Sequence, residues 1–178
     1  MMLSAKPFLN DIKEQMLNKL KNIKLIICDV DGVLTDGYLL INEQGDYMRR
    51  MNIKDGYALR YASDLGMQLA IISGAVQRLM KERFDKLGFQ HVYTGIKNKL
   101  EAFEALIDKL GLGPGECLFI GDDMLDIPLL KRVGYSCCPA DACDDVVAIV
   151  DFISSKNGGQ GCVREMVEKV LKIQGQWH

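Results

Sequence analysis

Two groups of aspartates, each placed directly after a predicted strand, are the residues of this chain best suited to chemistry. Strands are expected at 24–28 and 117–120, where the lack of polar alternation is typical of strands buried on both faces of a parallel sheet. Ligands bind beyond the carboxyl ends of such strands, so chemistry is expected there. After the first strand, a plain Asp-Gly turn is an equally good interpretation of the aspartate pair. After the second strand, clustered carboxylates destabilise a fold unless a cation or a proton compensates, which favours a functional site. The acids are Asp29, Asp31, Asp122, Asp123 and Asp126.

Two further junctions between predicted strands and helices carry groups that can hold an anion. Ser73 and Gly74 follow a strand predicted at 68–72 and precede a helix predicted at 76–87, so free backbone N–H groups there point at any bound anion. Lys99 opens a helix predicted to run to residue 110. A positive charge at that end opposes the helix dipole, and an anionic ligand would explain it. The alternatives are a simple helix cap at Ser73 and an ordinary surface lysine at Lys99.

The composition is that of a globular chain. Of its 178 residues, 48% are hydrophobic and 26% are charged, and the net charge is −2. Lysines and arginines are dispersed, so neither nucleic acid nor a membrane surface is expected as a partner. A secretory signal and a run of about 18 apolar residues are both lacking, which favours a cytoplasmic location. The six cysteines lack paired spacing and are expected to be buried, reduced thiols.

The alternation of predicted strands and helices indicates an α/β fold, with a doubly wound (Rossmann-like) parallel sheet flanked by helices. We expect a single domain over 1–178, with an N-terminal helix within 1–22, a β-hairpin at 37–51, and a glycine-rich stretch and C-terminal helix at 157–178. The hairpin follows the first aspartates directly. It can therefore serve as a flap or a partner surface, or be a plain edge hairpin.

The order, residue types and predicted context of these segments resemble the four motifs of the haloacid dehalogenase (HAD) superfamily of phosphohydrolases, over nearly the whole chain. The resemblance implies that Asp29 is a nucleophile that forms an aspartyl-phosphate. It also implies that Asp31 protonates the leaving oxygen and then activates water. Ser73, Gly74 and Lys99 are then expected to hold the phosphoryl oxygens.

Charge balance in this site predicts a metal ion. Five clustered carboxylates face one lysine, and a phosphate substrate adds negative charge, so a hard divalent cation with oxygen ligands is expected, namely Mg²⁺. By the resemblance, its ligands are the Asp29 carboxylate, the Asp31 backbone carbonyl and the Asp122 carboxylate. Asp123 and Asp126 are expected behind these ligands, with Asp126 orienting Lys99 or metal-bound water.

The resemblance also implies a member without a cap domain, because the first gap between motifs holds only the hairpin and one helix. A neighbouring subunit can then close the site. Four segments resemble the subfamily of 3-deoxy-D-manno-octulosonate 8-phosphate phosphatases. That subfamily is tetrameric, and the resemblance implies that hairpins form the subunit contacts and that the glycine-rich tail reaches towards an adjacent active site. The segments are 29–37, 52–57, 121–123 and 158–165.

The implied substrate is a sugar-acid phosphate, 3-deoxy-D-manno-octulosonate 8-phosphate, from lipopolysaccharide precursor synthesis. Ala75 departs from the subfamily pattern, because many members carry an arginine there that can meet the sugar-acid carboxylate. The closest alternative substrate is 2-keto-3-deoxynononate 9-phosphate or another sugar-acid phosphate. The cations that can replace the arginine are Arg49, Arg50, Lys54, Arg78 and Arg83. The candidate substrate contacts are Asn52, Asp55, Arg78, Gly159 and Arg164.

Two other classes of protein fit parts of the pattern. A phospho-acceptor receiver domain shares the sheet, the acidic magnesium ligands and a lysine. Its phospho-acceptor follows the third strand, whereas here the Asp-x-Asp pair follows the first. A catalytically idle oligomerisation domain would not require all five acids and Lys99.

Overall fold

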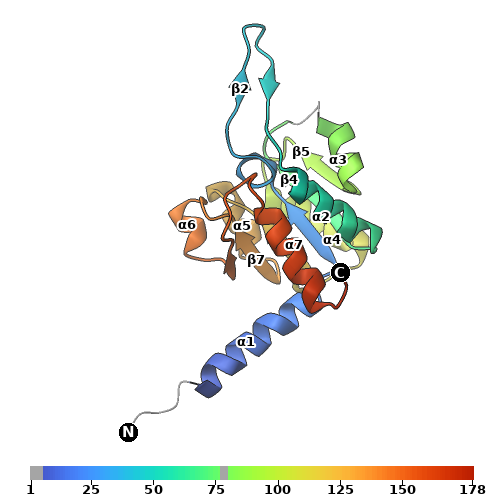
Figure 1. Cartoon of the computed structure of the whole chain (residues 1–178), viewed down its shortest axis with the longest axis vertical. Helices are drawn as coiled ribbons and strands as arrows, with labels where there is room; N and C mark the ends of the chain where they lie inside the picture. The colour runs from blue at the N-terminus through green and yellow to red at the C-terminus, as the bar shows by residue number, and fades with distance from the viewer. Residues whose placement is uncertain (1–5, 77–79) are drawn as a thin grey trace.

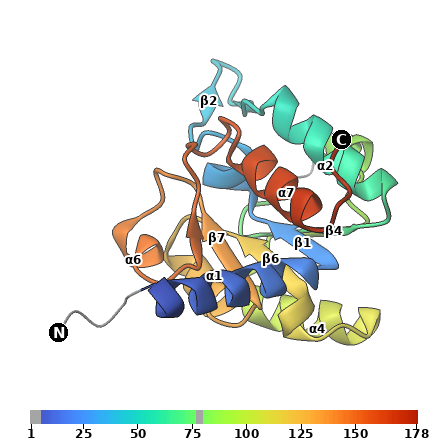
Figure 2. The ribbon, with the colours of Figure 1, turned by 60° about the horizontal axis from the view of Figure 1, so that its bottom comes forward.

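A parallel sheet of six strands forms the centre of the molecule (Figure 1, Figure 2). The computed structural model of the chain describes residues 6–76 and 80–178. The strand order is β5-β4-β1-β6-β7-β8, so the first strand lies between two later ones, and the predicted doubly wound sheet is confirmed. The strands are β1 (Leu25–Cys28), β4 (Gln68–Ser73), β5 (His91–Thr94), β6 (Cys117–Ile120), β7 (Tyr135–Cys138) and β8 (Phe152–Ile153).

Helices cover both faces of this sheet, because alternate strand residues point to opposite sides. Ile26 and Cys28 of β1 face a core built with α1, α2, α3 and α7. Leu25 and Ile27 face a second core built with α4, α5 and α6. The helices are α1 (Lys6–Lys21), α2 (Ile53–Asp64), α3 (Lys81–Leu87), α4 (Lys99–Leu110), α5 (Ile127–Leu130), α6 (Asp144–Val147) and α7 (Cys162–Ile173).

The register of the central strands brings the predicted site residues to one edge. Cys28 of β1 lies beside Ile71 of β4 and Ile120 of β6. Asp29 follows Cys28 directly, Ser73 is the last residue of β4, and Asp122 lies two positions beyond Ile120. The carboxyl ends of three adjacent strands therefore present these side chains together.

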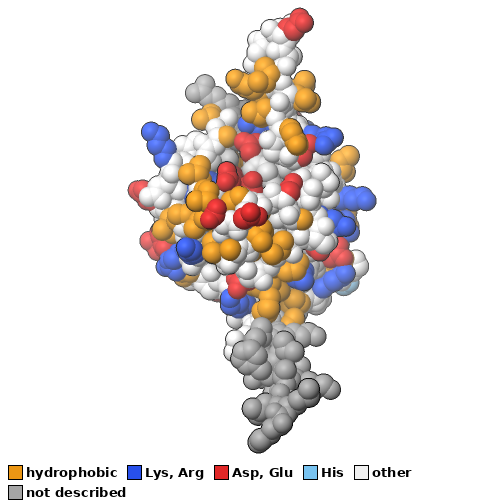
Figure 3. Space-filling view, turned by 90° about the vertical axis from the view of Figure 1, so that its left-hand side faces the viewer, with side chains coloured by type: hydrophobic (Ala, Val, Ile, Leu, Met, Phe, Trp, Pro, Cys, Tyr) orange, Lys and Arg blue, Asp and Glu red, His pale blue; other side chains and the backbone are white. Residues whose placement is uncertain are grey.

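The predicted β-hairpin is confirmed, and it projects from the body of the molecule (Figure 1). Its strands β2 (Leu40–Ile41) and β3 (Tyr47–Met48) pair antiparallel. Hydrophobic side chains lie on both sides of the projection (Figure 3). We call the exposed apolar residues of this element the hairpin patch: Tyr38, Leu39, Leu40, Ile41, Tyr47 and Met48.

Two predicted element boundaries differ from the structure. The apolar spacing of residues 57–65 predicts a helix that starts at Tyr57, but the helix begins at Ile53, because the side chain of Asn52 caps it by accepting a hydrogen bond from Lys54 N at 2.8 Å. The apolar residues of 149–153 predict a strand over that range, of which only β8 is formed. Asp151 lies outside that strand because its side chain binds Ser136 of β7. The beginning of the helix predicted at 76–87 falls partly outside the described residues.

All six cysteines are free thiols, and five of them are buried, as expected. Among the described residues, no helix is long and apolar enough to cross a membrane.

Candidate active site

Asp29 lies at the exit of β1, where the chain leaves the sheet in a single wide turn. This turn, η1 (Val30–Leu34), is closed by the Thr35 N–H, which donates to Val30 O at 3.0 Å. Gly32 has a φ of +86°, and a Cβ at this position would lie 2.0 Å from Asp122 Oδ2, so only glycine fits. We call residues 29–36 the Asp29 loop. Its tight path holds the backbone of the first motif against the Asp122 side chain.

Asp29 is almost completely buried and both its oxygens are bound. Oδ1 accepts a hydrogen bond from Val30 N at 2.7 Å, and Oδ2 accepts one from Lys99 Nζ at 2.7 Å. Lys99 is 5% exposed and also donates to Asp126 Oδ1 at 2.6 Å. Lys99 therefore lies in the first turn of α4 because two buried carboxylates hold it there, which accounts for the unfavourable position of its charge against the helix dipole.

Asp126 fixes the backbone of the second acidic group. Its Oδ2 accepts hydrogen bonds from Asp122 N at 2.9 Å and Asp123 N at 3.3 Å, while its Oδ1 binds Lys99. Asp123 is exposed, and its side chain accepts a hydrogen bond from Met124 N at 2.7 Å. Asp126 thus orients Lys99 and the 122–123 peptide, and Asp123 caps the short turn η4 (Met124–Asp126).

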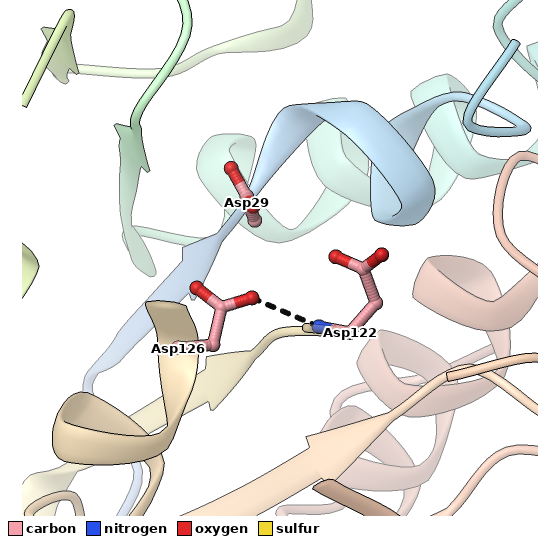
Figure 4. Close-up of side chains that lie close together, drawn as sticks. All are labelled: Asp29, Asp122 and Asp126. Atoms are coloured by element: carbon pink, nitrogen blue, oxygen red, sulfur yellow. Dashed lines mark hydrogen bonds between the residues drawn. The ribbon is translucent and has the colours of Figure 1, made fainter. Parts of the chain in front are cut away.

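Three carboxylates of this site are close enough to share a metal ion. Asp29, Asp122 and Asp126 each offer an oxygen, and these atoms lie within 4.8 Å of one another (Figure 4). Asp126 is the least available, because its oxygens accept three hydrogen bonds, one from Lys99 and two from backbone N–H groups, whereas those of Asp29 accept two. Asp122 is the most available: its Oδ1 is buried and lacks a hydrogen-bond partner in the described chain. A buried carboxylate oxygen without a partner is costly, and a divalent cation would compensate it.

Burial and mutual repulsion keep protons in this cluster. Burial and the charge of Asp126 raise the pKa of Asp29 to about 6, and Lys99 opposes this shift. Burial and the charges of Asp126 and Asp29 raise the pKa of Asp122 to about 8. Burial alone would lower the pKa of Lys99, but the two bound carboxylates raise it overall. Without a cation, the site therefore retains about one proton near neutral pH.

Two arginines at the base of the hairpin hold the Asp29 loop. Arg49 binds both oxygens of Asp31, with Nε to Oδ1 at 2.6 Å and Nη2 to Oδ2 at 3.2 Å. Arg50 Nη2 lies 2.6 Å from Asp36 Oδ2. From the sequence, both arginines are candidates only as cations for a substrate. The only feature of the sequence that indicates these ion pairs is the position of both arginines at the end of the predicted hairpin, which follows the first aspartates.

The structure gives four of the five candidate substrate contacts a partner within the chain. Asn52 caps α2, and Asp55 is buried and accepts a hydrogen bond from Arg164 N at 2.6 Å. The Arg164 guanidinium lies between the rings of Tyr57 and Trp177, at 5.7 and 5.1 Å from their centroids. Gly159 N donates to Val33 O at 2.9 Å, which places it on the Asp29 loop of its own chain. The fifth candidate, Arg78, lies outside the described residues.

The phosphate-binding candidates occupy the remaining side of the site. Ser73 is 1% exposed at the end of β4, and Gly74 follows it. Ser73 O accepts a hydrogen bond from Ile96 N at 3.1 Å, so the turn after β5 supports this junction. Ala75 follows in the sequence, so this position offers no charged side chain.

Together, the parallel sheet and the acid-lysine cluster at its edge define a phosphohydrolase-type site. A family model of haloacid dehalogenase-like hydrolases matches residues 53–134. The chain belongs to this family, because it is 37% identical over 93% of its length to a curated phosphatase.

The 3-deoxy-D-manno-octulosonate 8-phosphate phosphatase of Escherichia coli K12 is 37% identical over 165 residues, which cover 93% of this chain and 88% of that protein. The phosphatase of the same name from Moraxella catarrhalis was crystallised in complex with magnesium, phosphate and KDO. It superimposes with a TM-score of 0.88 at 35% identity and covers 94% of both chains. A HAD superfamily (subfamily III A) hydrolase from Legionella pneumophila gives a TM-score of 0.91 at 36% identity, covering 94% of this chain and 92% of that one. These relatives do not favour a receiver domain or an idle oligomerisation domain.

Proposed function

We propose that this protein is a Mg²⁺-dependent phosphatase that hydrolyses 3-deoxy-D-manno-octulosonate 8-phosphate to 3-deoxy-D-manno-octulosonate and phosphate, a step of lipopolysaccharide precursor synthesis. The observation that carries the reaction class is the buried Lys99 between Asp29 and Asp126, beside the unpartnered oxygen of Asp122. The substrate is supported by relatives of that name, which this chain matches over most of their length.

Asp29 is the nucleophile in this proposal. Its carboxylate attacks phosphorus, the bond to the sugar oxygen breaks, and an aspartyl-phosphate forms. The attack requires the ionised form of Asp29, which the Lys99 charge and the Val30 N–H both favour. Both groups also fix the orientation of the carboxylate, so that the entropy of alignment is lost on folding and not during the reaction.

Asp31 transfers the protons. It protonates the departing sugar oxygen in the first step, and then removes a proton from the water that attacks the aspartyl-phosphate, which releases phosphate and regenerates Asp29. Asp31 lies two positions after Asp29, within the wide turn, and Arg49 binds both of its carboxylate oxygens. Arg49 therefore orients this carboxylate before substrate arrives, and Asp31 carries the transferred proton on an oxygen that Arg49 has released.

The other site residues neutralise charge. The Ser73 hydroxyl, the Gly74 N–H and Lys99 bind phosphoryl oxygens as the bond to the sugar breaks. The Asp29 and Asp122 carboxylates and the Asp31 carbonyl would hold Mg²⁺, which when bound offsets the charge of the acids and of the phosphate. Asp126 keeps Lys99 in place, and Asp123 supports the turn behind Asp122.

Arg49 is the cation best placed to compensate for Ala75. Of the replacement candidates that the structure describes, it is the one that pairs with the Asp-x-Asp motif. Arg50 binds Asp36 instead, and Lys54 lines a groove along α7. On binding of a sugar acid, Arg49 can exchange one oxygen of Asp31 for an oxygen of the substrate carboxylate, because its guanidinium carries five donors.

We further propose that the protein works as a homotetramer in the cytoplasm. The hairpin patch carries six large apolar side chains that are half or more exposed in most cases, which fits a surface for another subunit. Association through it would bring neighbouring chains near the uncapped site and exclude water from it. The six free thiols suit a reducing compartment.

The test is Mg²⁺-dependent phosphate release, with chelator controls, from octulosonate 8-phosphate, 2-keto-3-deoxynononate 9-phosphate and simple sugar phosphates. We expect kcat/KM to be at least about a hundredfold higher for the octulosonate, which is about 2.7 kcal/mol of discrimination in the transition state. Asp29→Asn should abolish turnover and leave the circular dichroism spectrum unchanged. Equal rates across the panel would refute the substrate, and full activity of Asp29→Asn would refute the mechanism.

A further inference from the structure

The glycine tract, residues 158–161, packs backbone to backbone against the Asp29 loop. A Cβ on Gly158 would lie 1.9 Å from Gly32 O, and one on Gly159 would lie 2.6 Å from Asp36 N. Gly159 N also donates to Val33 O at 2.9 Å. Glycine is therefore needed at both positions, because any side chain would keep the two backbone segments apart. The tract packs directly against the loop that carries the candidate nucleophile.

The tract is anchored at both of its ends. On one side, Gly158 N donates to Asp141 Oδ1 at 2.8 Å. On the other side the tract runs into α7, whose N-cap residue, Gly161, has no side chain to cap the helix and adopts a φ of +110°. The first backbone N–H groups of α7 thus need acceptors from elsewhere in the fold.

Asp55 supplies one of these acceptors from another helix. Its Oδ1 accepts a hydrogen bond from Arg164 N, the third residue of α7, at 2.6 Å, and the Asp55 side chain is 2% exposed. A carboxylate at a helix N-terminus is also favoured by the helix dipole. Cys162, in the same turn, is held by a contact of 3.4 Å from its Sγ to Val33 O. The start of α7 is thereby tied to α2 and to the Asp29 loop at once.

We propose that Asp55 is a positioning residue for the reaction: by capping α7 it holds the glycine tract against the Asp29 loop and so fixes the placement of Asp29 and Asp31. This role rests on the proposed function, in which Asp29 and Asp31 of the loop carry out the reaction. It differs from a substrate contact, since Asp55 is buried and its Oδ1 accepts a hydrogen bond from the start of a helix inside the protein.

The test compares Asp55→Ala and Asp55→Asn with a matched control at the opposite end of α7. Gln174→Ala is that control, because Gln174 Nε2 ties the end of α7 to the carbonyls of Leu20 and Ile23, away from the site. Steady-state rates with octulosonate 8-phosphate and amide hydrogen exchange of 30–36 and 157–161 are measured on variants that circular dichroism shows to be folded.

We expect Asp55→Ala to lower kcat at least tenfold with KM changed less than threefold, and to speed amide exchange in both segments at least tenfold. Asp55→Asn, which keeps an acceptor oxygen, should retain kcat within about threefold of wild type. Gln174→Ala should change neither kcat nor exchange in these segments by more than twofold.

Three outcomes would overturn the proposal: an equal loss of kcat in Gln174→Ala, a rise in KM alone in Asp55→Asn, or unchanged exchange in Asp55→Ala. Absence of turnover in wild type with every phosphate tested would refute the proposed function instead. The exchange data would still decide whether Asp55 holds the tract on the loop.

Discussion

Lowering the pH from 8 to 6 should weaken Mg²⁺ binding about a hundredfold, because protons compete with the metal for the same carboxylates. The pKa of Asp122 is raised to about 8, so about half of this group is ionised at pH 8 and about one hundredth at pH 6. The pKa of Asp29 is raised to about 6, which adds a factor of about two over the same range. The product corresponds to about 2.7 kcal/mol of binding free energy.

Calorimetric titration of the metal-free protein with Mg²⁺ at pH 6, 7 and 8 checks this. Repeating the titration at pH 7 in two buffers of different ionisation enthalpy should show about one proton released per ion bound. Asp122→Asn should lose most of the affinity together with its pH dependence. Asp64→Asn changes an exposed carboxylate paired with Arg60 and serves as the control. This variant should keep both the Mg²⁺ affinity and its pH dependence. A change in affinity below about threefold between pH 6 and 8, or no released proton, would refute the reasoning.

Four further predictions follow from the same contacts. Lys99→Met leaves two buried carboxylates without their cation and should lower the free energy of unfolding in urea by about 3–5 kcal/mol; a loss below 1 kcal/mol would contradict the ion pairs. Arg49→Ala should raise KM for octulosonate 8-phosphate at least tenfold but barely change KM for glucose 6-phosphate, and an equal effect on both would rule out carboxylate recognition. Leu40→Asp should shift the sedimentation coefficient to that of a smaller species, whereas an unchanged value would exclude the hairpin patch as the interface. The pKa values of Asp29 and Asp122 are raised in the folded state, so the folded protein binds more protons than the unfolded chain between pH 5 and 8. The melting temperature of the metal-free protein should therefore fall as the pH rises over this range, and a rise would contradict the raised pKa values.

The strands that position the site could be predicted from the sequence, because a strand buried on both faces is a short, continuous apolar run. β1 and β6 are short runs without polar alternation, and the acids at their ends interrupt this apolar pattern abruptly. The first and last residues of the helices were harder to predict from the sequence. The start of α2 depends on the cap at Asn52, while the apolar spacing that predicts the helix is clear only from Tyr57 onwards.

The sequence predicts that the acids and Lys99 lie together at one edge of the sheet, but it does not predict their hydrogen-bond partners. Lys99 was expected near an anion; its two partners are 70 and 27 positions away in sequence, and only the folded sheet brings them together. The pairing of Arg49 with Asp31 depends on how the hairpin returns to the sheet edge. The sequence does not indicate which face of α2 meets α7, so the hydrogen bond from Arg164 N to Asp55 could not be predicted.

The contact between the glycine tract and the Asp29 loop also has a consequence for synthesis of the chain. Val33 and Cys162 are 129 positions apart, so the loop is made long before the segment that supports it. At about 5–20 residues per second, a ribosome needs about 6–26 s to add the intervening residues. A nascent chain can form its first helices during this interval, but the Asp29 loop still lacks the backbone segment that packs against it. We therefore expect the loop to reach its final placement only after the chain has been extended past Cys162.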